Sequence, residues 1–264
     1  MSDLTLTLPT ARPAAAIRDT ATMIGRGVRL SRRNLEALIT ALMLPVILML
    51  LFVYLFGGAI NTGTRYVTYV VPGVILLCAG FGSATTAVSV SQDMTNGIID
   101  RFRAMDISAA ALIAGHVVAS VIRNAVSTVL VFGVALAIGY RPHGSVAEWL
   151  GAIAILLMFM AAVSWFAATV GLLASTPEAA SGFTFGVMFL PYASSAFVPI
   201  DTMPHWLQGF SRHQPCTPVT ESLRSLLAGQ PVGSHAATAI AWCAGILAVS
   251  MVASTIAFWR RTTN

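Results

Sequence analysis

Long apolar runs without a charged side chain dominate this chain. A transmembrane helix needs about 20 predominantly apolar residues. Charge-free runs of this kind lie within residues 37–64, 66–92, 149–177, 179–200 and 236–259. A further run, within 107–140, is apolar apart from Arg123. The pattern therefore predicts an all-α polytopic membrane protein with six transmembrane helices in one domain over residues 37–264, and Pro45 is expected to kink the first helix.

Residues 1–36, before the first apolar run, form a polar leader. From Ile17 to Val28, apolar residues recur at helical spacing with arginines between them. Such a helix binds in the membrane interface, with its arginines near anionic lipid headgroups. We expect a cytoplasmic leader whose residues 14–36 form this interfacial helix. The alternative is a solvated segment, which Gly25 and Gly27 favour.

The segment QDMTNGIIDRFRAMD, residues 92–106, separates the second and third apolar runs. On a helix its apolar side chains fall within one arc and its charged ones face away. We expect a short cytoplasmic helix that either docks a partner protein, with Phe102 and Met105 as apolar contacts, or lies on lipid. The candidate interface residues are Ile98, Asp100, Arg101, Phe102, Arg103 and Met105.

Residues 201–234, between the fifth and sixth runs, are too many for a simple turn and too apolar for a solvated loop. Pro204 suits the first turn of one helix, and Thr217-Pro218 opens another that Gly229 ends. We expect two short re-entrant helices at the outer interface, with Trp206 in the aromatic belt. The alternative is a folded external cap without a role in transport.

The few charges lie mostly at the ends of the apolar runs. Only 9% of the residues are charged, against about 25% in an average soluble domain. With six spans, ten arginines lie on the side of the termini: Arg12, Arg18, Arg26, Arg29, Arg32, Arg33, Arg101, Arg103, Arg260 and Arg261. Four lie opposite: Arg65, Arg141, Arg212 and Arg224. The positive-inside rule therefore predicts a multi-pass protein of the plasma (inner) membrane with both termini cytoplasmic.

All 15 basic residues are arginine, and the chain contains no lysine. A Walker A loop needs its lysine on the nucleotide phosphates, and Schiff-base mechanisms need a lysine amine. Any ATP hydrolysis must therefore come from another chain. The net charge of +5 could suggest nucleic acid. Because the arginines flank apolar runs, we expect membrane lipid as the partner and no nucleic acid.

The usual signs of an enzyme are missing from the sequence. The three cysteines and five histidines have no metal-ligand spacing, and no nucleophile elbow occurs. We expect no catalytic, cofactor or metal site in this chain, and cysteines that act as small apolar filler. Serines within the spans, such as Ser164 and Ser194, are expected to form hydrogen bonds between helices.

Arg123 is the one charge inside an apolar run. A charge at the bilayer centre costs at least about 2.5–3.5 kcal/mol on insertion scales, so its side chain should face protein or water. Its partner could be Glu178, Asp106 or a backbone carbonyl, or the guanidinium could snorkel to the cytoplasmic interface. A structural role and a role in the transport pathway both stay open.

Several motifs together resemble a known family. They are the stretch GIIDRFRAMDISAAALIAGHVVASVIRN (97–124), the block SSAFVPIDTMPHWLQGFSRHQP (194–215), the leader and the six apolar runs. The chain resembles the type-2 ABC exporter permeases, and most of all the daunorubicin-resistance type of bacterial drug-efflux permease. The resemblance extends from about residue 20 over most of the chain.

The resemblance implies a permease that dimerises with a second copy or a paralogue and pairs with cytosolic ABC ATPase subunits, which use the ATP. Residues 92–106 would be the coupling helix and the leader the connecting helix. The first and fifth spans would line the subunit interface. There Gly182 and Gly186, four residues apart, would permit close helix contact.

We therefore expect export of a hydrophobic or amphipathic substrate, drug-like or lipid-like. One alternative is a secondary transporter or channel, which needs a buried carboxylate or a polar pore lining. The other is an intramembrane enzyme, for which the sequence offers no catalytic group. An adjacent reading frame with a Walker A motif would favour the exporter.

Overall fold

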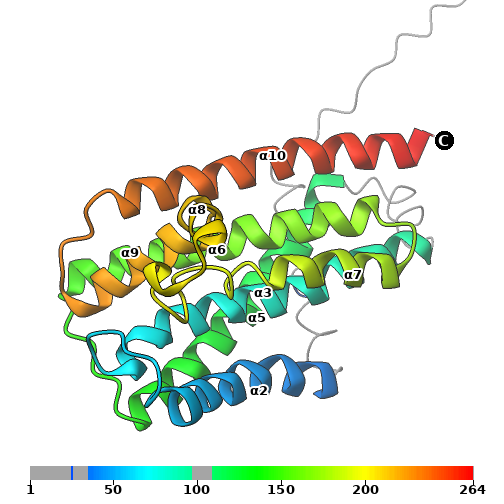
Figure 1. Cartoon of the computed structure of the whole chain (residues 1–264). Coiled ribbons are helices and arrows are strands. Elements are labelled where there is room, and N and C mark those ends of the chain that lie inside the picture. The colour runs from blue at the N-terminus through cyan, green and yellow to red at the C-terminus, as the bar shows by residue number, and fades with distance from the viewer. Residues whose placement is uncertain (1–24, 26–34, 97–108, 264) are drawn as a thin grey trace, which may run out of the picture.

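The structure is a computed structural model that describes residue 25, residues 35–96 and residues 109–263 (Figure 1). This part of the chain consists of helices, turns and loops, in agreement with the predicted all-α class. In chain order the helices are α2 (Leu35–Leu51), the π-helix η1 (Phe52–Phe56), α3 (Tyr66–Thr95), α5 (Ala109–Ala137), α6 (Val146–Leu173), α7 (Pro177–Met188), the 3₁₀ turn η2 (Ile200–Thr202), α8 (His205–His213), α9 (Cys216–Ala228) and α10 (His235–Thr263).

Four of the six predicted spans are helices long and apolar enough to cross a membrane, namely α3, α5, α6 and α10. The first predicted span corresponds to α2 and η1, whose described apolar stretch, Met43–Phe56, is shorter. Pro45 lies inside α2. Most of the leader and most of the predicted coupling helix lie outside the described residues. Residues 92–95 of that segment form the last turn of α3 instead.

The fifth predicted span, within 179–200, differs most from expectation. Its α-helix, α7, ends at Met188, and residues 189–198 continue as turns. Pro191 explains the break, because proline has no N–H for the helical ladder and disfavours helical geometry at the residue before it. Consecutive turns partly replace the ladder, with N–H groups of Leu190, Tyr192 and Ser194 donating to carbonyls three residues back.

The turns of residues 189–198 are called the turn segment here. Together with α7, this segment runs along α3 from Ala87 to Tyr66. Ala180 clusters with Ala87, near one end of α3. Further along, Met188 lies beside Gly80. At the other end the Tyr66 hydroxyl donates to the Phe197 carbonyl at 3.0 Å. Irregular backbone at membrane depth is tolerated where it is buried in protein, and residues 194–197 of the turn segment are buried.

The helix boundaries follow local signals in the sequence. Ser145 and Glu148 form a capping box at the start of α6: the Ser145 N–H donates to Glu148 Oε2 at 2.6 Å, and the Glu148 N–H donates to Ser145 Oγ at 3.4 Å. Thr176 caps α7, with Pro177 in its first turn. α9 ends at Gly229, whose φ of +66° is a conformation that glycine adopts without strain.

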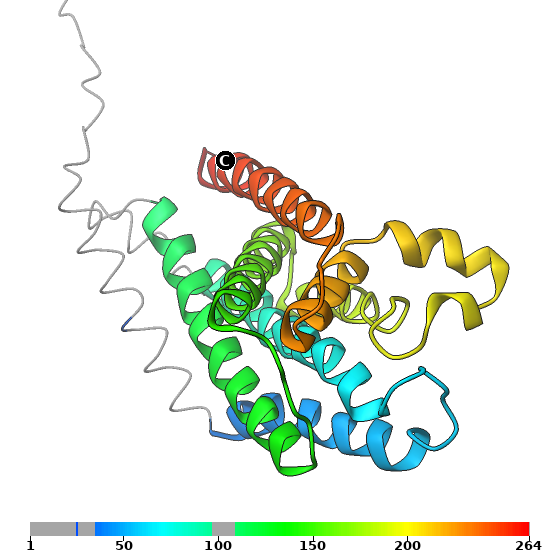
Figure 2. The same cartoon turned by 90° about the vertical axis from the view of Figure 1, so that its left-hand side faces the viewer.

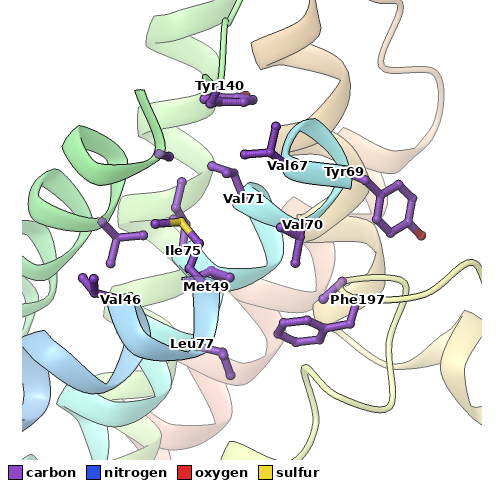
Figure 3. Close-up of a cluster of buried hydrophobic side chains, with 14 of the residues drawn as sticks. Val46, Met49, Val67, Tyr69, Val70, Val71, Ile75, Leu77, Tyr140 and Phe197 are labelled. Atoms are coloured by element: carbon purple, nitrogen blue, oxygen red, sulfur yellow. The ribbon is translucent and has the colours of Figure 1, made fainter. Parts of the chain in front are cut away.

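α3 is the central helix of the bundle, and most of its residues are buried. α2, α5, α6, α7 and α9 all pack against it, while α10 packs on α6 (Figures 1 and 2). At the start of α3, valines from α3 meet Met49 of α2, Tyr140 and Phe197 in one apolar cluster (Figure 3). At its other end, Val90 clusters with Ile113, Leu172 and Phe258. We call the Tyr66 end the outer end and the Val90 end the cytoplasmic end, following the predicted topology.

The two short helices predicted between the fifth and sixth spans are present as α8 and α9. α8 follows Pro204 and projects from the side of the bundle (Figure 2). α9 is instead buried: Cys216, at its start, joins the apolar cluster of Leu76 and Phe159 inside the bundle. Beside its last residue, the Leu227 carbonyl accepts from the His143 N–H at 2.9 Å, next to the start of α6. α9 therefore dips into the bundle from the outer end.

Candidate functional site

The carbonyl oxygen of Gly82, near the middle of α3, gathers polar side chains from two helices. From α5, Arg123 Nη2 donates to it at 3.0 Å and Ser120 Oγ at 3.4 Å. From α3 itself, the Thr85 and Thr86 hydroxyls donate to it at 2.8 and 3.3 Å. Polar side chains hydrogen-bond across helices in this way in membrane proteins. The Gly82 carbonyl is therefore a polar tie between two otherwise apolar spans.

Arg123 lies midway along α5, about 21 Å from either helix end at 1.5 Å per residue. Its Nη2 also donates to Thr86 Oγ1 at 2.9 Å. Of the partners considered from the sequence, a backbone carbonyl is observed, while Asp106 lies outside the described residues. The guanidinium stays at the depth of the middle of α5 and does not snorkel to the cytoplasmic end. Thr86 was not anticipated, because the pairing joins residues 37 positions apart.

Further polar side chains extend the hydrogen bonds around Gly82 from α3 and α5 into α6. Ser164 Oγ donates to Ser120 Oγ at 2.9 Å and lies 3.4 Å from Ser83 Oγ. Asn124, which is completely buried, donates from Nδ2 to the Ala79 carbonyl at 3.5 Å. We refer to these six residues as the polar layer: Ser83, Thr86, Ser120, Arg123, Asn124 and Ser164.

The expectation for span serines holds at one position and fails at another. Ser164 does bond between helices. Ser194 instead donates to the Pro191 carbonyl at 2.5 Å and accepts from the Ala196 N–H at 3.1 Å. Both contacts are within the turn segment, because α7 has already ended there. Ser194 therefore shapes a turn.

Close backbone approach surrounds the polar layer. A Cβ on Gly82 would overlap the Asn124 side-chain oxygen, and one on Gly171 of α6 would overlap the Ala87 carbonyl of α3. Small residues at such positions let membrane helices approach closely. α3, α5 and α6 therefore form a tightly packed unit around mid-helix polar contacts.

A second polar contact joins α3 and α5 near the cytoplasmic end. His116 Nε2 lies 3.1 Å from Asp93 Oδ2, and both side chains are largely buried. Sequence analysis had assigned Asp93 to the cytoplasmic segment and had found no metal-ligand spacing among the histidines. The pair exists because α3 continues to Thr95. Asp93 is thus a buried carboxylate, but it lies in the last turn of its helix, away from the polar layer.

At the outer end, Arg224 of α9 ties three segments together. Its Nη2 donates to the Tyr69 carbonyl at 3.1 Å and to the Ser195 carbonyl at 2.9 Å. Its guanidinium carbon lies 3.8 Å from the centre of the Tyr69 ring, and Nη1 donates to Glu221 at 2.6 Å. Sequence analysis had used Arg224 only as a topology charge. Its contacts join α9 to α3 and to the turn segment.

The remaining predicted site residues divide into exposed and undescribed ones. A Cβ on Gly182 or Gly186 would meet nothing within 4 Å, so this side of α7 is open. Phe185 and Phe189 are 58% and 56% exposed. Trp206 of α8 is 80% exposed. The predicted coupling residues, Ile98, Asp100, Arg101, Phe102, Arg103 and Met105, lie outside the described residues.

The three cysteines are unpaired and buried. Cys78 lies in the apolar cluster around Met49, and Cys216 and Cys243 lie in the apolar cluster around Phe159. Such thiols are chemically inert. The expectation of apolar filler is consistent with this burial.

Comparison with known proteins supplies the context for this arrangement. Residues 18–228 match the family described as ABC-2 type transporter. The chain is 31% identical over 238 residues to the daunorubicin resistance ABC transporter permease protein DrrB1 of Streptomyces coeruleorubidus, covering 89% of this chain and 84% of that protein.

Two further relatives have similar descriptions. The probable doxorubicin resistance ABC transporter permease protein DrrC of Mycobacterium tuberculosis is 24% identical over 261 residues, covering 97% of this chain and 95% of the relative. The putative transport permease ycf38 of Cyanophora paradoxa is 27% identical over 208 residues, covering 75% and 70%.

Proposed function

The chain belongs to the ABC-2 type transporter family and is a transmembrane permease subunit, and we propose that it forms the membrane path of an exporter for hydrophobic or amphipathic molecules of drug-like or lipid-like kind. The observation that carries the proposal is similarity to two drug-resistance permeases over most of the chain. The apolar composition of the spans agrees with such a cargo, because a strongly polar molecule would lose its hydration among them.

The energy source is proposed to be a separate ABC ATPase. A lysine-free chain cannot contain a Walker A loop. The ATPase would dock on residues 92–106, with Phe102, Met105 and Ile98 as apolar contacts. The charged side chains of Asp100, Arg101 and Arg103 would set the orientation of the bound ATPase. This segment joins the cytoplasmic ends of α3 and α5, so a push on it would reach the polar layer through both helices.

We propose six membrane crossings over residues 37–264, after a cytoplasmic leader of residues 1–36. Support for the fifth crossing is that α7 and the turn segment follow α3 from Ala87 to Tyr66. Support for the first is that α2 and η1 form a continuous helical stretch over residues 35–56. An even number of crossings and the arginine distribution put both termini in the cytoplasm, with the chain in the plasma membrane.

The working unit is proposed to be a dimer with a second copy or a paralogue. The open side of α7, with Gly182, Gly186 and two exposed phenylalanines, could pack closely against another subunit. If the substrate passes between two subunits, the polar layer inside each subunit holds α3, α5 and α6 together and does not contact the substrate. Trp206 on the projecting α8 suits the outer membrane interface.

The test is ATP-driven transport by the permease together with its ATPase. The permease should copurify with an ABC ATPase from its native membrane. Inside-out vesicles containing the pair should accumulate daunorubicin when ATP is added, and should fail to do so when the Walker A lysine of the ATPase is replaced. Accumulation that needs a proton gradient and ignores ATP would instead establish a secondary transporter.

A further inference from the structure

An apolar pocket of about 150 Å³ lies where α3, α6, α7 and α10 come together. Its lining includes Gly80 of α3, Val163 and Phe166 of α6, Val187 at the end of α7, Pro191 of the turn segment and Ile246 of α10. The pocket exists because the α-helix of α7 stops at Met188 and the turn segment follows a different course. Its other lining residues are also apolar, apart from the weakly polar thiol of Cys216.

The pocket lies at the depth of the hydrocarbon core. Gly80, Val163 and Ile246 each fall in the middle third of their helix, and these helices are the ones long enough to cross a membrane. α10 and α7 both pack on α6 but do not pack against each other. The pocket is therefore open sideways, between α7 and α10, onto the surroundings of the bundle.

We propose that this pocket binds one hydrocarbon chain of a membrane lipid, which enters from the bilayer between α7 and α10. Binding sites for drug-like molecules usually add a few polar groups that orient the ligand. This lining offers none, so a polar atom placed here would lose its hydration without a hydrogen-bond partner. A lipid chain has no such atom. A protein cavity of about this volume holds one benzene ring, so a short stretch of chain fits.

The site is distinct from the contacts assigned to transport and dimerisation. No residue of the polar layer lines it, and it does not include Gly182 or Gly186. The bound chain packs against Val187 and Pro191 and so supports the point where α7 gives way to turns. The inference rests on the chain being embedded in a membrane and does not depend on the cargo.

Photo-crosslinking in bilayers tests the site directly. The full-length protein would be placed in phosphatidylcholine bilayers that contain a lipid with a photoreactive diazirine on one acyl chain. After illumination, peptide mass spectrometry should locate adducts on residues 159–166 and 187–191. Adducts are also expected on Val249 and Val252, which are exposed on α10 and report the general contact with lipid.

Filling the pocket should remove its adducts alone. Val163→Phe places a ring in the pocket, whereas Ile153→Phe adds the same ring on an exposed part of α6. We expect loss of the pocket adducts in the first variant and retention in the second, with Val249 and Val252 labelled in both. If Val163→Phe does not fold, Val187→Phe fills the pocket from α7 and has the same expected result.

Three outcomes would overturn the proposal. One is a wild-type protein labelled on α10 but not in the pocket. Another is a folded pocket-filling variant that keeps the pocket adducts. The third is competition by excess daunorubicin, which would make the pocket part of the transport route. ATP-driven daunorubicin uptake, measured separately on the same variants, tests the proposed function and leaves the lipid result independent of it.

Discussion

At the scale of single residues, two arginines hold helices together through main-chain carbonyls. Arg123 donates to the Gly82 carbonyl in the middle of α3, and Arg224 donates to the carbonyls of Tyr69 and Ser195 at the outer end. A guanidinium suits both positions because it offers several donors in a rigid plane and can stack on an aromatic ring. In this lysine-free chain, at least two of the arginines therefore have a structural role.

Arg224→Lys should destabilise the protein by about 1–2 kcal/mol, since a lysine cannot reproduce the planar donors and the ring contact. Arg212→Lys is the matched control, because Arg212 forms one exposed ion pair with Asp201. Thermal unfolding in detergent, followed by tryptophan fluorescence, measures both. Equal unfolding temperatures for the two variants would contradict the role of Arg224.

Arg123→Gln should keep a donor near the Gly82 carbonyl and yield close to normal amounts of folded protein. Arg123→Met removes the donor from the polar layer and should lower stability by about 1–2 kcal/mol. Export per folded molecule should be unchanged in both, as measured by daunorubicin uptake into vesicles. Folded Arg123→Gln protein with strongly reduced export would place Arg123 in the transport pathway.

At the scale of elements, glycines decide how closely α3 meets its neighbours. Gly171 of α6 faces the Ala87 carbonyl, and Gly73 of α3 faces Ala196 of the turn segment, where a Cβ would lie 2.6 Å from the Ala196 Cβ. These contacts explain why a central helix can be surrounded by five others. Membrane helices gain from such contact through packing rather than through exclusion of water.

Gly171→Ala should destabilise the bundle by about 1–3 kcal/mol, because the added methyl forces α6 away from α3. Gly245→Ala in α10 is the control, since a Cβ there meets nothing within 4 Å. Its expected change is neutral to slightly stabilising, because alanine favours the helix. The comparison uses unfolding temperatures in detergent, and similar losses for the two variants would argue against close packing at Gly171.

At the scale of the whole molecule, the described chain leaves wide apolar surfaces uncovered. Exposed apolar side chains lie on α2 and η1, on α5, on α7 and on α10. A membrane can cover most of them, because bilayer hydrocarbon is as apolar as these side chains. α7 differs from the others by combining two open glycines with exposed phenylalanines, which favours contact with another subunit there.

Gly186→Leu should lower the yield of chemically cross-linked dimer in membranes while the folded monomer persists. The bulky side chain would hold a facing helix away from α7. Gly133→Leu, at another open position on α5, should leave the yield unchanged. An unaltered dimer yield for Gly186→Leu would move the interface elsewhere.

Replacing Phe102 and Met105 together by alanine should uncouple the permease from its ATPase. Loss of these apolar contacts should leave ATP hydrolysis active and remove most ATP-driven uptake. Phe210→Ala on the outer α8 is the control and should transport normally. Normal uptake by the double variant would exclude residues 92–106 as the coupling surface.

The features that the sequence predicted correctly have signals within a few residues, whereas the contacts that it missed join distant segments. The start of α6 at Ser145, the end of α9 at Gly229 and the short helix after Pro204 were readable because their signals lie within a few residues. The break of α7 near Pro191 was also signalled locally, but an apolar run of sufficient length favoured a full span. The Asp93–His116 pair was missed because the end of α3 was placed three residues too early.

By itself the amino-acid sequence determined that this is a helical membrane protein whose lysine-free chain cannot form a Walker A loop. Run length and charge position are local properties on which the bilayer acts directly, and the absence of lysine is a property of the composition. Tertiary structure alone decided which atoms satisfy Arg123, which face of α7 stays open and where an apolar pocket remains. Those features depend on contacts between segments tens of residues apart, and one sequence does not encode such pairings in any local pattern.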